Sequence, residues 1–362
     1  MVDDARWMRR ALEHARRGLG RTTPNPVVGA CVVTADGVVV GDGCHERAGD
    51  PHAEIFALEE AGTRARGATL YCTLEPCAHT GRTGPCTDRI VAAGIARVVA
   101  AMEDPFPLVR GRGFAALREQ GIAVDTGVER GEAVRLNQPF LTTIREGRPF
   151  VILKAATSLD GRLAAATGVR TQLTSVAAAR HAHCQRAQVD AIAIGSRTLL
   201  VDDPRLTVRL VYRARPLTRV IFDRGLRASP EARVFATLSE GPVIILTSAD
   251  ARRRYVDRVR ALEEAGATLM AVEGSSLTAA VRALGERGIQ SLLIEGGAAI
   301  HGAAWDEGVA DYVQLYVAPM TLGSLGPAFL DGRGFVPASL FEQKVRSLGP
   351  DVLIEGYVHR PD

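Results

Sequence analysis

Short apolar segments alternate with segments of helical period along most of this 362-residue chain. The first half shows the pattern between residues 27 and 126, and the second half shows it between residues 150 and 318. Strands that alternate with helices are typical of α/β domains, in which helices cover a largely parallel sheet. Because the chain is longer than one ordinary domain, the two stretches predict two α/β domains.

The predicted domain boundary follows a polar helix at residues 129–146, which leads to Gly147-Arg148-Pro149. Glycine and proline commonly end helices, so we expect domains at residues 1–147 and 148–362. In the first domain the patterns predict helices at 3–18, 52–61, 86–93 and 113–120, a hairpin within 27–43, and strands at 68–74, 97–102 and 122–126. In the second they predict strands at 150–155, 191–195, 219–222, 243–247, 291–295 and 312–318, and helices at 174–186, 251–265, 277–288 and 298–305.

Composition narrows the class of protein. Hydrophobic residues make up 46% of the chain and charged residues 23%, as in ordinary globular proteins. The formal net charge is only +3 and aromatic residues are 5%, which predicts neither a basic groove nor stacking platforms for nucleic acid. No apolar run approaches the roughly 18 residues of a membrane helix, and residues 1–10 do not resemble a signal peptide. We expect a cytoplasmic protein with reduced cysteines and no nucleic-acid or membrane partner.

One histidine and two cysteines lie at predicted junctions of strands and helices. His52-Ala53-Glu54 begins one helix, Pro76-Cys77 follows a strand, and Cys86 begins the next helix. Histidine and cysteine are zinc ligands, and three protein ligands leave a fourth position for water, as a catalytic zinc requires. Zinc lowers the pKa of such a water to about 7, and Glu54 is placed to carry the proton.

Zinc nucleobase deaminases carry this combination, with two residues between the cysteines. Here eight residues separate Cys77 from Cys86, so the intervening loop, with His79 and Arg82, could line a pocket. A structural zinc site and unrelated core cysteines are the alternatives. His181, His183 and Cys184 form a weaker second metal candidate on one predicted helix.

Other candidate residues carry weaker signals. Asn25 lies between two prolines, where its amide could pair with a pyrimidine edge or simply belong to a turn. Lys154 lies in an apolar run of a chain that otherwise uses arginine, and it could reach a substrate or extend to water. Glu295-Gly296-Gly297 between a strand and a helix could leave backbone N–H groups for an anion. Arg186 and Arg209 are candidates for a phosphate.

With these residues in view, the chain resembles the bifunctional deaminase–reductases of riboflavin biosynthesis. The matching motifs include Pro24-Asn25-Pro26, His52-Ala53-Glu54, Thr73-Leu74-Glu75-Pro76-Cys77, Ser158-Leu159-Asp160-Gly161-Arg162, Asp202-Asp203-Pro204 and Glu295-Gly296-Gly297. The resemblance runs from about Arg9 to Tyr357. It implies a three-layer cytidine-deaminase-like domain followed by a dihydrofolate-reductase-like α/β domain.

The resemblance implies both reactions and their residues. The family removes an amino group from 2,5-diamino-6-(5-phosphoribosylamino)pyrimidin-4(3H)-one with zinc, and then reduces the ribosyl group to ribityl with NADPH. By motif, His52, Cys77 and Cys86 would bind zinc, Glu54 would transfer the proton, and Asn25, His45, Ala53 and Arg82 would contact the pyrimidine. Cofactor contacts would fall at Thr157, Gln172, Thr198, Asp202, Arg224 and Gly297, and reductase substrate contacts at Lys154, Arg170, Arg186, Leu206, Arg209 and Glu295.

Two positions depart from the family pattern and leave alternatives open. The family commonly has tryptophan where this chain has Gln172, and serine where it has Arg224. One alternative is therefore a monofunctional deaminase with an inactive reductase half. The others are a nucleoside or nucleic-acid deaminase and a zinc-stabilised binding module. Assembly into a homo-oligomer is also left open.

Overall fold

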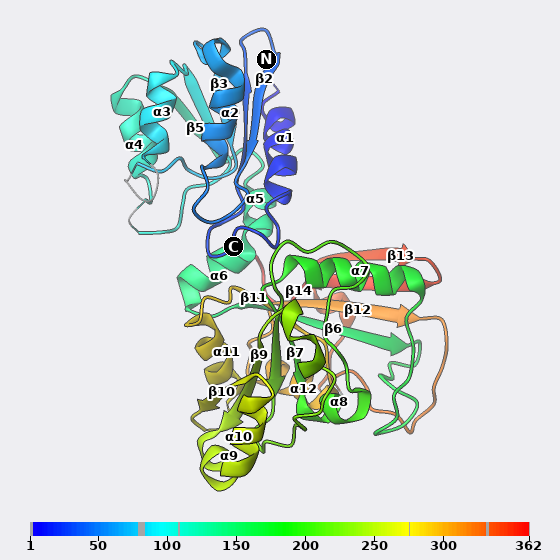
Figure 1. Cartoon of the computed structure of the whole chain (residues 1–362). Helices are drawn as coiled ribbons and strands as arrows, with labels where there is room; N and C mark the ends of the chain where they lie inside the picture. Colours follow the sequence, from blue (N-terminus) through cyan, green and yellow to red (C-terminus); the bar gives the residue numbers. More distant parts are fainter. Residues whose placement is uncertain (1–2, 79–83, 108, 275, 331–332, 362) are drawn as a thin grey trace. The chain divides into compact units, whose positions relative to one another are not determined.

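The computed structural model describes residues 3–78, 84–107, 109–274, 276–330 and 333–361. The chain divides into two compact units, of which the first reaches Glu146 and the second spans Gly147–Arg360. Each unit contains a sheet with helices packed on it (Figure 1). The α/β class predicted for both halves is confirmed.

The first unit is built on a five-stranded sheet in the order β2-β1-β3-β4-β5. The strands are β1 Gly29–Val33, β2 Val39–Cys44, β3 Thr69–Cys72, β4 Arg97–Ala100 and β5 Ala123–Thr126. The helices are α1 Asp4–Arg16, α2 Ala53–Ala61, the short 3-10 helix η1 Gly62–Ala65, α3 Cys86–Ala92, α4 Arg112–Glu119, α5 Arg130–Leu136 and α6 Gln138–Glu146. Strand β1 is antiparallel to β2 and β3, whereas β3, β4 and β5 are parallel.

Two glycines allow helices to approach this sheet from opposite faces. A Cβ at Gly29 would lie 2.0 Å from the carbonyl oxygen of Ala11 in α1, and one at Gly43 would lie 2.0 Å from that of Ala53 in α2. Gly43 pairs with Ala30, the neighbour of Gly29 in β1, and successive strand residues face opposite sides. Helices α1 and α2 therefore cover different faces, which gives the three layers that were predicted.

The single helix predicted for residues 129–146 is wrong, because α5 and α6 are separated at Asn137. The Asn137 side chain bonds the backbone of Val27 instead. The Val27 N–H donates to Asn137 Oδ1 over 2.9 Å, and Asn137 Nδ2 donates to the Val27 carbonyl over 3.0 Å. The break thus ties the end of the first unit to the loop that contains Asn25.

The second unit contains a nine-stranded sheet in the order β10-β9-β8-β7-β11-β6-β12-β14-β13. The strands are β6 Phe150–Ser158, β7 Ala191–Gly195, β8 Thr218–Phe222, β9 Val243–Ser248, β10 Ala267–Val272, β11 Ser291–Ile294, β12 Tyr312–Ala318, β13 Phe341–Leu348 and β14 Asp351–Tyr357. The helices are α7 Val176–Gln188, α8 Ser196–Asp202, α9 Ala249–Arg254, α10 Val256–Glu264, α11 Leu277–Gly285 and α12 Ala298–Asp306, with 3-10 helices η2 Phe235–Glu240 and η3 Pro337–Ser339. The pairs of β14 with β12 and with β13 are antiparallel, and the other pairs are parallel.

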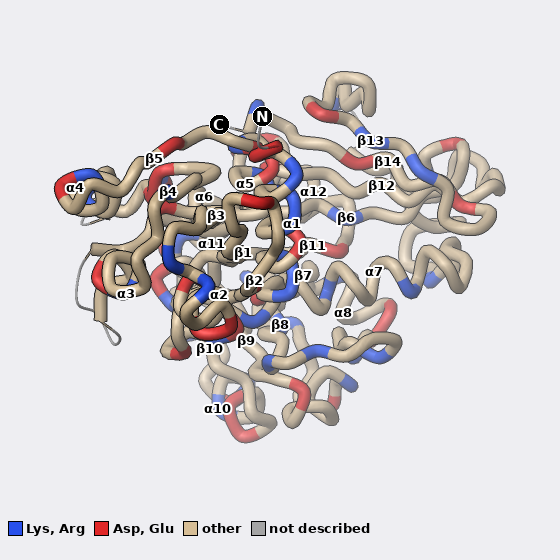
Figure 2. Tube along the Cα trace, turned by 90° about the horizontal axis from the view of Figure 1, so that it is seen from above, with Lys and Arg blue, Asp and Glu red and all other residues tan. Residues whose placement is uncertain are grey.

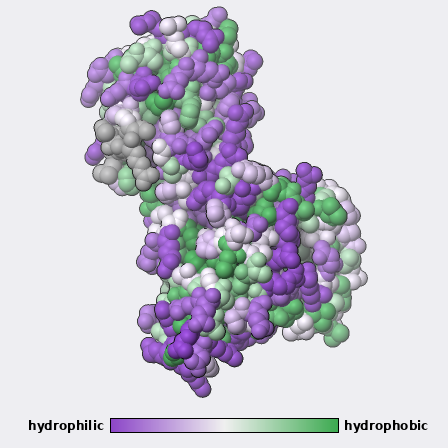
Figure 3. All heavy atoms as spheres, in the orientation of Figure 1, coloured by the Kyte–Doolittle hydropathy of each residue, from purple (hydrophilic) through white to green (hydrophobic). Residues whose placement is uncertain are grey.

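Buried aliphatic side chains form the cores of both units. The visible surface is mostly hydrophilic, with small apolar patches on each unit (Figure 3). Basic and acidic positions are interspersed along the trace of each unit (Figure 2). Among the described residues, no helix combines the length and apolar character needed to cross a membrane.

Candidate active sites

His52, Cys77 and Cys86 converge in the first unit. His52 is the N-cap residue of α2, Cys86 is the first residue of α3, and Cys77 follows β3. His52 Nδ1 lies 3.2 Å from Cys86 Sγ and 3.5 Å from Cys77 Sγ, and the three ligand atoms all lie within 4.8 Å of one another. The structure therefore brings together side chains that are up to 34 positions apart in sequence.

This donor set fits a zinc ion. With Zn–N near 2.0 Å and Zn–S near 2.3 Å, tetrahedral geometry places a nitrogen and a sulfur ligand roughly 3.5 Å apart. The two observed nitrogen–sulfur distances, 3.2 and 3.5 Å, agree with that spacing. One imidazole and two sulfurs are also the ligand types that zinc prefers, and three ligands leave one position for water.

Before a metal binds, one of the three side chains is already in its ligating form, and zinc would displace protons from the other two. Hydrogen bonding to Cys86 lowers the pKa of Cys77 to about 4, with help from His52 and against the effect of burial. The pKa of Cys86 is raised because it shares this hydrogen bond and is buried. The hydrogen bond with Cys77 raises the pKa of His52 to about 9. Cys77 is thus held as a thiolate, the form of cysteine that binds metals.

Glu54 lies in the first turn of α2, two residues after His52. The residue is only 3% exposed, and among the residues described its Oε2 has no hydrogen-bond partner. Burial raises the pKa of the carboxyl group, and the nearby His52 opposes this effect. A carboxyl group with a raised pKa suits a residue that must accept a proton and return it.

Asn25 and His45 form a connected pair beside His52. Asn25 Nδ2 lies 2.9 Å from His45 Nε2, and the rings of His45 and His52 meet edge to face with centroids 5.5 Å apart. Burial lowers the pKa of His45, so its ring is neutral and Nδ1–H can donate to the Pro51 carbonyl 3.1 Å away. Nε2 then accepts from the Asn25 amide, whose carbonyl oxygen remains for another donor.

Two further predicted contacts have different outcomes. Ala53 is fully buried at the start of α2, between the ligand His52 and Glu54. Arg82, predicted to contact the pyrimidine, lies with His79 outside the described residues.

The sequence patterns did not single out Asp104. This residue is 9% exposed, and its charge contributes to the raised pKa of His52. Strands β3 and β4 are parallel neighbours, so the segments that carry Cys77 and Asp104 leave the sheet at the same edge. The sequence signal that could have identified Asp104 is an acidic residue directly after a predicted buried strand.

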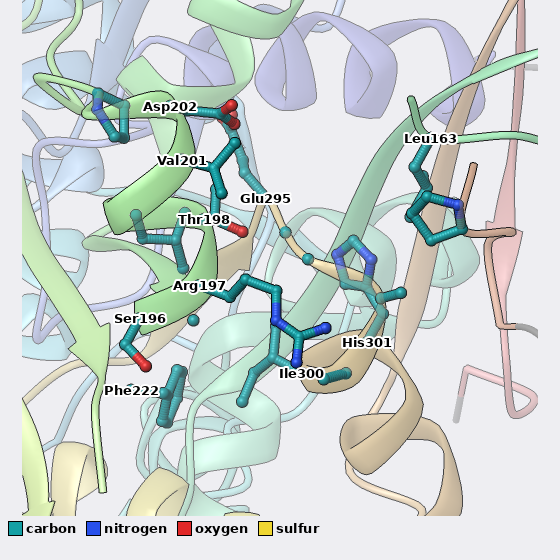
Figure 4. Close-up of a pocket in the computed structure, with 18 of the residues that line it drawn as sticks. Leu163, Ser196, Arg197, Thr198, Val201, Asp202, Phe222, Glu295, Ile300 and His301 are labelled. Atoms are coloured by element: carbon teal, nitrogen blue, oxygen red, sulfur yellow. The ribbon is translucent and has the colours of Figure 1, made fainter. Parts of the chain in front are cut away.

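The second unit contains a cavity of about 1130 Å³ at the carboxyl ends of β7, β8, β9 and β11. Figure 4 shows Thr198 and Asp202 on α8 and Glu295 and His301 on other sides of the same space. Ligand pockets commonly have volumes of about 300–1000 Å³, so this cavity lies just above the upper end of that range. A Cβ at Gly297 would lie 3.0 Å from Thr198 Oγ1, so glycine keeps the approach to the N-terminus of α12 open.

Glu295 joins two cations on the wall of this cavity. Arg186 on α7 donates from Nε and from its second terminal nitrogen to the two Glu295 oxygens, over 2.6 and 2.7 Å. Lys154 Nζ on β6 lies 3.8 Å from Glu295 Oε2 and 5.3 Å from the ring centre of Tyr316. Burial alone would raise the pKa of Glu295, but Arg186 and Lys154 lower it to about 2. Burial lowers the pKa of Lys154 itself, against the effect of Glu295.

Most residues predicted for the second site line this one cavity: Lys154, Arg170, Gln172, Arg186, Thr198, Asp202, Leu206, Arg209, Arg224, Glu295 and Gly297. Thr157 does not line it and is 2% exposed within β6. Gln172, one of the two departures, is exposed and its amide donates to the Thr174 carbonyl over 3.0 Å. Arg224, the other, is also exposed.

The second metal candidate is not assembled. His181 Nδ1 lies 2.8 Å from the Tyr316 hydroxyl and its Nε2 lies 3.0 Å from Arg346. His183 Nδ1 instead accepts from the backbone N–H of Arg209. Within the described ranges, the only histidine, cysteine and acidic side chains grouped closely enough for a metal are those of the first unit.

Comparisons with known proteins assign a family to each half. Residues 1–102 match the cytidine and deoxycytidylate deaminase zinc-binding region, and residues 149–354 match the RibD C-terminal domain. The riboflavin biosynthesis protein RibD of Aquifex aeolicus is 40% identical over 357 residues, covering 97% of both chains. That of Escherichia coli is 41% identical over 372 residues, covering 98% of this chain and 99% of its own.

Solved structures agree over the same length. RibD of Acinetobacter baumannii is similar with a TM-score of 0.85 and 36% identity, covering 98% of this chain and 99% of its own. A diaminohydroxyphosphoribosylaminopyrimidine deaminase/5-amino-6-(5-phosphoribosylamino)uracil reductase of Thermotoga maritima has a TM-score of 0.83 and 35% identity, covering 97% of both chains. Together with a zinc-type ligand set in the first unit, these matches show that the chain belongs to the RibD family of bifunctional deaminase–reductases of riboflavin biosynthesis.

Proposed function

We propose that the first unit hydrolyses 2,5-diamino-6-(5-phosphoribosylamino)pyrimidin-4(3H)-one and that the second unit reduces the product with NADPH. The observation that carries the first half is the convergence of three zinc-type ligand atoms near the buried Glu54 Oε2, which has no hydrogen-bond partner in the described part of the chain. The reaction named for the Thermotoga maritima protein supports the choice of substrate. The product would be the corresponding 5-amino-uracil, so the amino group at C2 is the one that leaves.

The deamination exchanges one bond at C2. Zinc, held by His52, Cys77 and Cys86, would supply a Lewis acid that lowers the pKa of water to about 7. Glu54 would move one proton from the attacking water to the ring nitrogen, and then the second proton from the C2 hydroxyl to the departing amine. A C–O bond forms, the C–N bond breaks, and ammonia leaves. The Asn25 carbonyl oxygen, fixed by the contact with His45, would accept from the pyrimidine edge.

In the second unit, NADPH would supply the hydride for reduction of the ribosyl group. The hydride adds to the sugar carbon that bears the amine, the bond from that carbon to the ring oxygen breaks, and the oxygen takes a proton. Lys154 would hold that proton inside the cavity, and Glu295 would fix both Lys154 and Arg186. Arg209, exposed at the cavity wall, would face the substrate phosphate.

The six free cysteines are compatible with the cytoplasm as the compartment.

The test is a two-step assay on purified full-length protein with zinc. We expect ammonia release from the diamino-pyrimidinone phosphate without NADPH, followed by NADPH oxidation equal to the ammonia released. NADPH should be used in preference to NADH. Ammonia release without any cofactor oxidation would instead favour the monofunctional deaminase, for which the exposed Gln172 amide in place of tryptophan is the motive. Deamination of nucleosides or RNA alone would reject the proposed substrate.

Asn137→Ala is expected to weaken the loop that carries Asn25. The change removes both hydrogen bonds to the Val27 backbone and leaves these buried groups without their partner. Such a loss costs about 1–3 kcal/mol of unfolding free energy. We expect that loss in denaturant unfolding of the first unit and a several-fold rise in the KM for the pyrimidine. Gln120→Ala, an exposed amide at the end of α4, is the control and should change neither quantity.

A further inference from the structure

Glu75 is a buried acid that the proposed chemistry does not use. It lies two residues before the ligand Cys77 and is 3% exposed. Its carboxylate accepts four backbone N–H groups. Oε1 accepts from Gly113 over 2.8 Å and from Phe114 over 3.4 Å. Oε2 accepts from Gly111 over 3.0 Å and from Asp104 over 3.2 Å.

These four N–H groups lie at the two ends of one stretch of chain, described over residues 104–107 and 109–114. Gly113 and Phe114 belong to the first turn of α4, where backbone N–H groups lack partners within the helix. Gly111 is the N-cap residue of α4, and Asp104 lies at the other end of the segment. A single carboxylate therefore holds the two ends of the segment together. It also joins both ends to the loop between β3 and Cys77, which contains Glu75.

A second contact joins the same two pieces of chain. A Cβ at Gly113 would lie 1.9 Å from the carbonyl oxygen of Pro76, the residue between Glu75 and Cys77. Helix α4 thus lies directly against the backbone that leads to the metal ligand, at a distance that only glycine permits.

The segment also borders the metal site. Asp104 is nearly buried, and its Oδ1 accepts from the Phe106 N–H over 2.8 Å, which fixes the start of the segment. Strands β3 and β4 are parallel neighbours, so Asp104 and Cys77 both follow strand ends at the same edge of the sheet. The other end is the start of α4. The Glu75 carboxylate therefore fixes both ends of the segment relative to the Cys77 loop.

We infer that Glu75 is a positioning residue for deamination, which holds residues 104–107 and 109–114 against the Cys77 loop as a fixed wall of the pyrimidine pocket. The inference rests on the proposed substrate of the first unit. Both Glu75 oxygens accept backbone N–H groups, so the side chain acts through the segment that it holds. A carboxylate that only capped α4 would influence stability alone, whereas a positioning carboxylate also controls how well the pyrimidine binds.

The test compares Glu75→Gln with the unchanged protein. Glutamine keeps the shape but turns an acceptor into an N–H₂ group that faces two N–H donors, so half of the contacts are lost. We expect the KM for the pyrimidine to rise about tenfold with kcat changed less than about threefold, because small misplacements of binding groups weaken productive binding. Zinc content should stay at one per chain. Amide hydrogen exchange should accelerate at one of the two donor pairs, either Gly113 and Phe114 or Gly111 and Asp104.

Three controls separate this role from general damage. Glu103→Gln, an exposed acid in the neighbouring loop that pairs with Arg110, should leave the KM unchanged. Reductase activity of the same samples, measured on the 5-amino-uracil phosphate, reports whether the second unit is intact. Gly113→Ala keeps the Glu75 carboxylate in the chain but displaces α4 from Pro76 and disturbs the bonds that Gly113 and Phe114 donate, and it should raise the KM in the same way even if Glu75→Gln folds poorly.

Each result decides between the possibilities. A KM that stays unchanged in Glu75→Gln despite faster exchange of either pair of amides overturns the inference. So does loss of zinc in proportion to the loss of activity, since that would make Glu75 a support of the metal ligand. If the unchanged protein releases no ammonia from this pyrimidine, the proposed function fails and the inference with it, whereas failure of the variants alone leaves the proposed function intact.

Discussion

Glu54→Gln is expected to lower the rate of ammonia release by about a thousandfold, within the 10²–10⁴-fold range typical of positioned proton transfer. The physical reason is specific to this carboxylate. Its Oε2 is buried and unpaired among the described residues, and burial raises its pKa, so it can accept and return a proton beside the zinc ligands. The glutamine amide keeps the size of the side chain but cannot carry the proton.

Zinc content and reductase activity should be unchanged in this variant, because Glu54 is not one of the grouped metal ligands and the second reaction occupies the other unit. Glu59→Gln is the matched control, since Glu59 lies on the same helix but is exposed and pairs with Arg89. It should deaminate at the normal rate. If Glu54→Gln also deaminates normally, the proton carrier is another group.

Glu295→Gln is expected to reduce the reductase rate by about a hundredfold or more while deamination continues. The Glu295 side chain is 8% exposed and lies between Arg186 and Lys154. Removal of its charge leaves two buried cations facing each other, and breaking such a pair costs about 3 kcal/mol or more. Both cations should therefore shift within the cavity, and misplaced groups of this kind lower rates by about 10².

The same variant can be tested through the pH dependence of its unfolding free energy. The folded-state pKa of Glu295 is about 2, below its ordinary value of 4.5, so its ionised form stabilises the folded protein. That stabilisation is complete above pH 4.5 and is lost as the pH falls towards 2. The difference in unfolding free energy between the unchanged protein and Glu295→Gln should be constant from pH 5 to 7 and shrink below pH 4.5. The exposed Glu286→Gln should show no such difference, and a constant difference down to pH 3 would contradict the assignment.

The zinc ligands could be predicted because each lies at the end of an element with a clear pattern. His52 and Cys86 occupy the starts of helices α2 and α3, and Cys77 follows a strand with a clear apolar pattern. Histidine and cysteine are zinc ligands, and all three residues occur at junctions of strands and helices. These two features together were enough to predict that three distant side chains bind one metal. The Asn25–His45 contact needed the fold, because it depends on how the loop before β1 meets the end of β2.

The positioning residues could not be predicted, because their partners are backbone groups. Glu75 bonds four N–H groups between 29 and 39 positions away, and no side-chain pattern records such an arrangement. Asn137 likewise bonds the backbone of Val27, 110 positions away. The break between α5 and α6 does have a local signal, because Pro139 lacks the backbone N–H that one continuous helix would need.

Three strands of the second sheet were not predicted. Strand β13 is exposed over nearly all its length and therefore lacks the alternation that marks a half-buried strand. Its partner β14 and the opposite edge strand β10 were also missed, although both alternate in burial over part of their length. The helix predicted at 251–265 is interrupted at Tyr255, which separates α9 from α10. None of these errors touches the cavity residues Lys154 and Glu295, which lie on or at the end of central strands whose patterns were clear.

The proposed deamination depends on a zinc ion that is bound by one nitrogen and two sulfur atoms of the protein, with one position left for water. Zinc K-edge X-ray absorption of the purified full-length protein measures this ligand set directly. We expect one zinc per chain with two sulfur atoms at about 2.3 Å and two nitrogen or oxygen atoms at about 2.0 Å. A zinc bound by three or four sulfur atoms, or a protein that retains no zinc, would contradict the account.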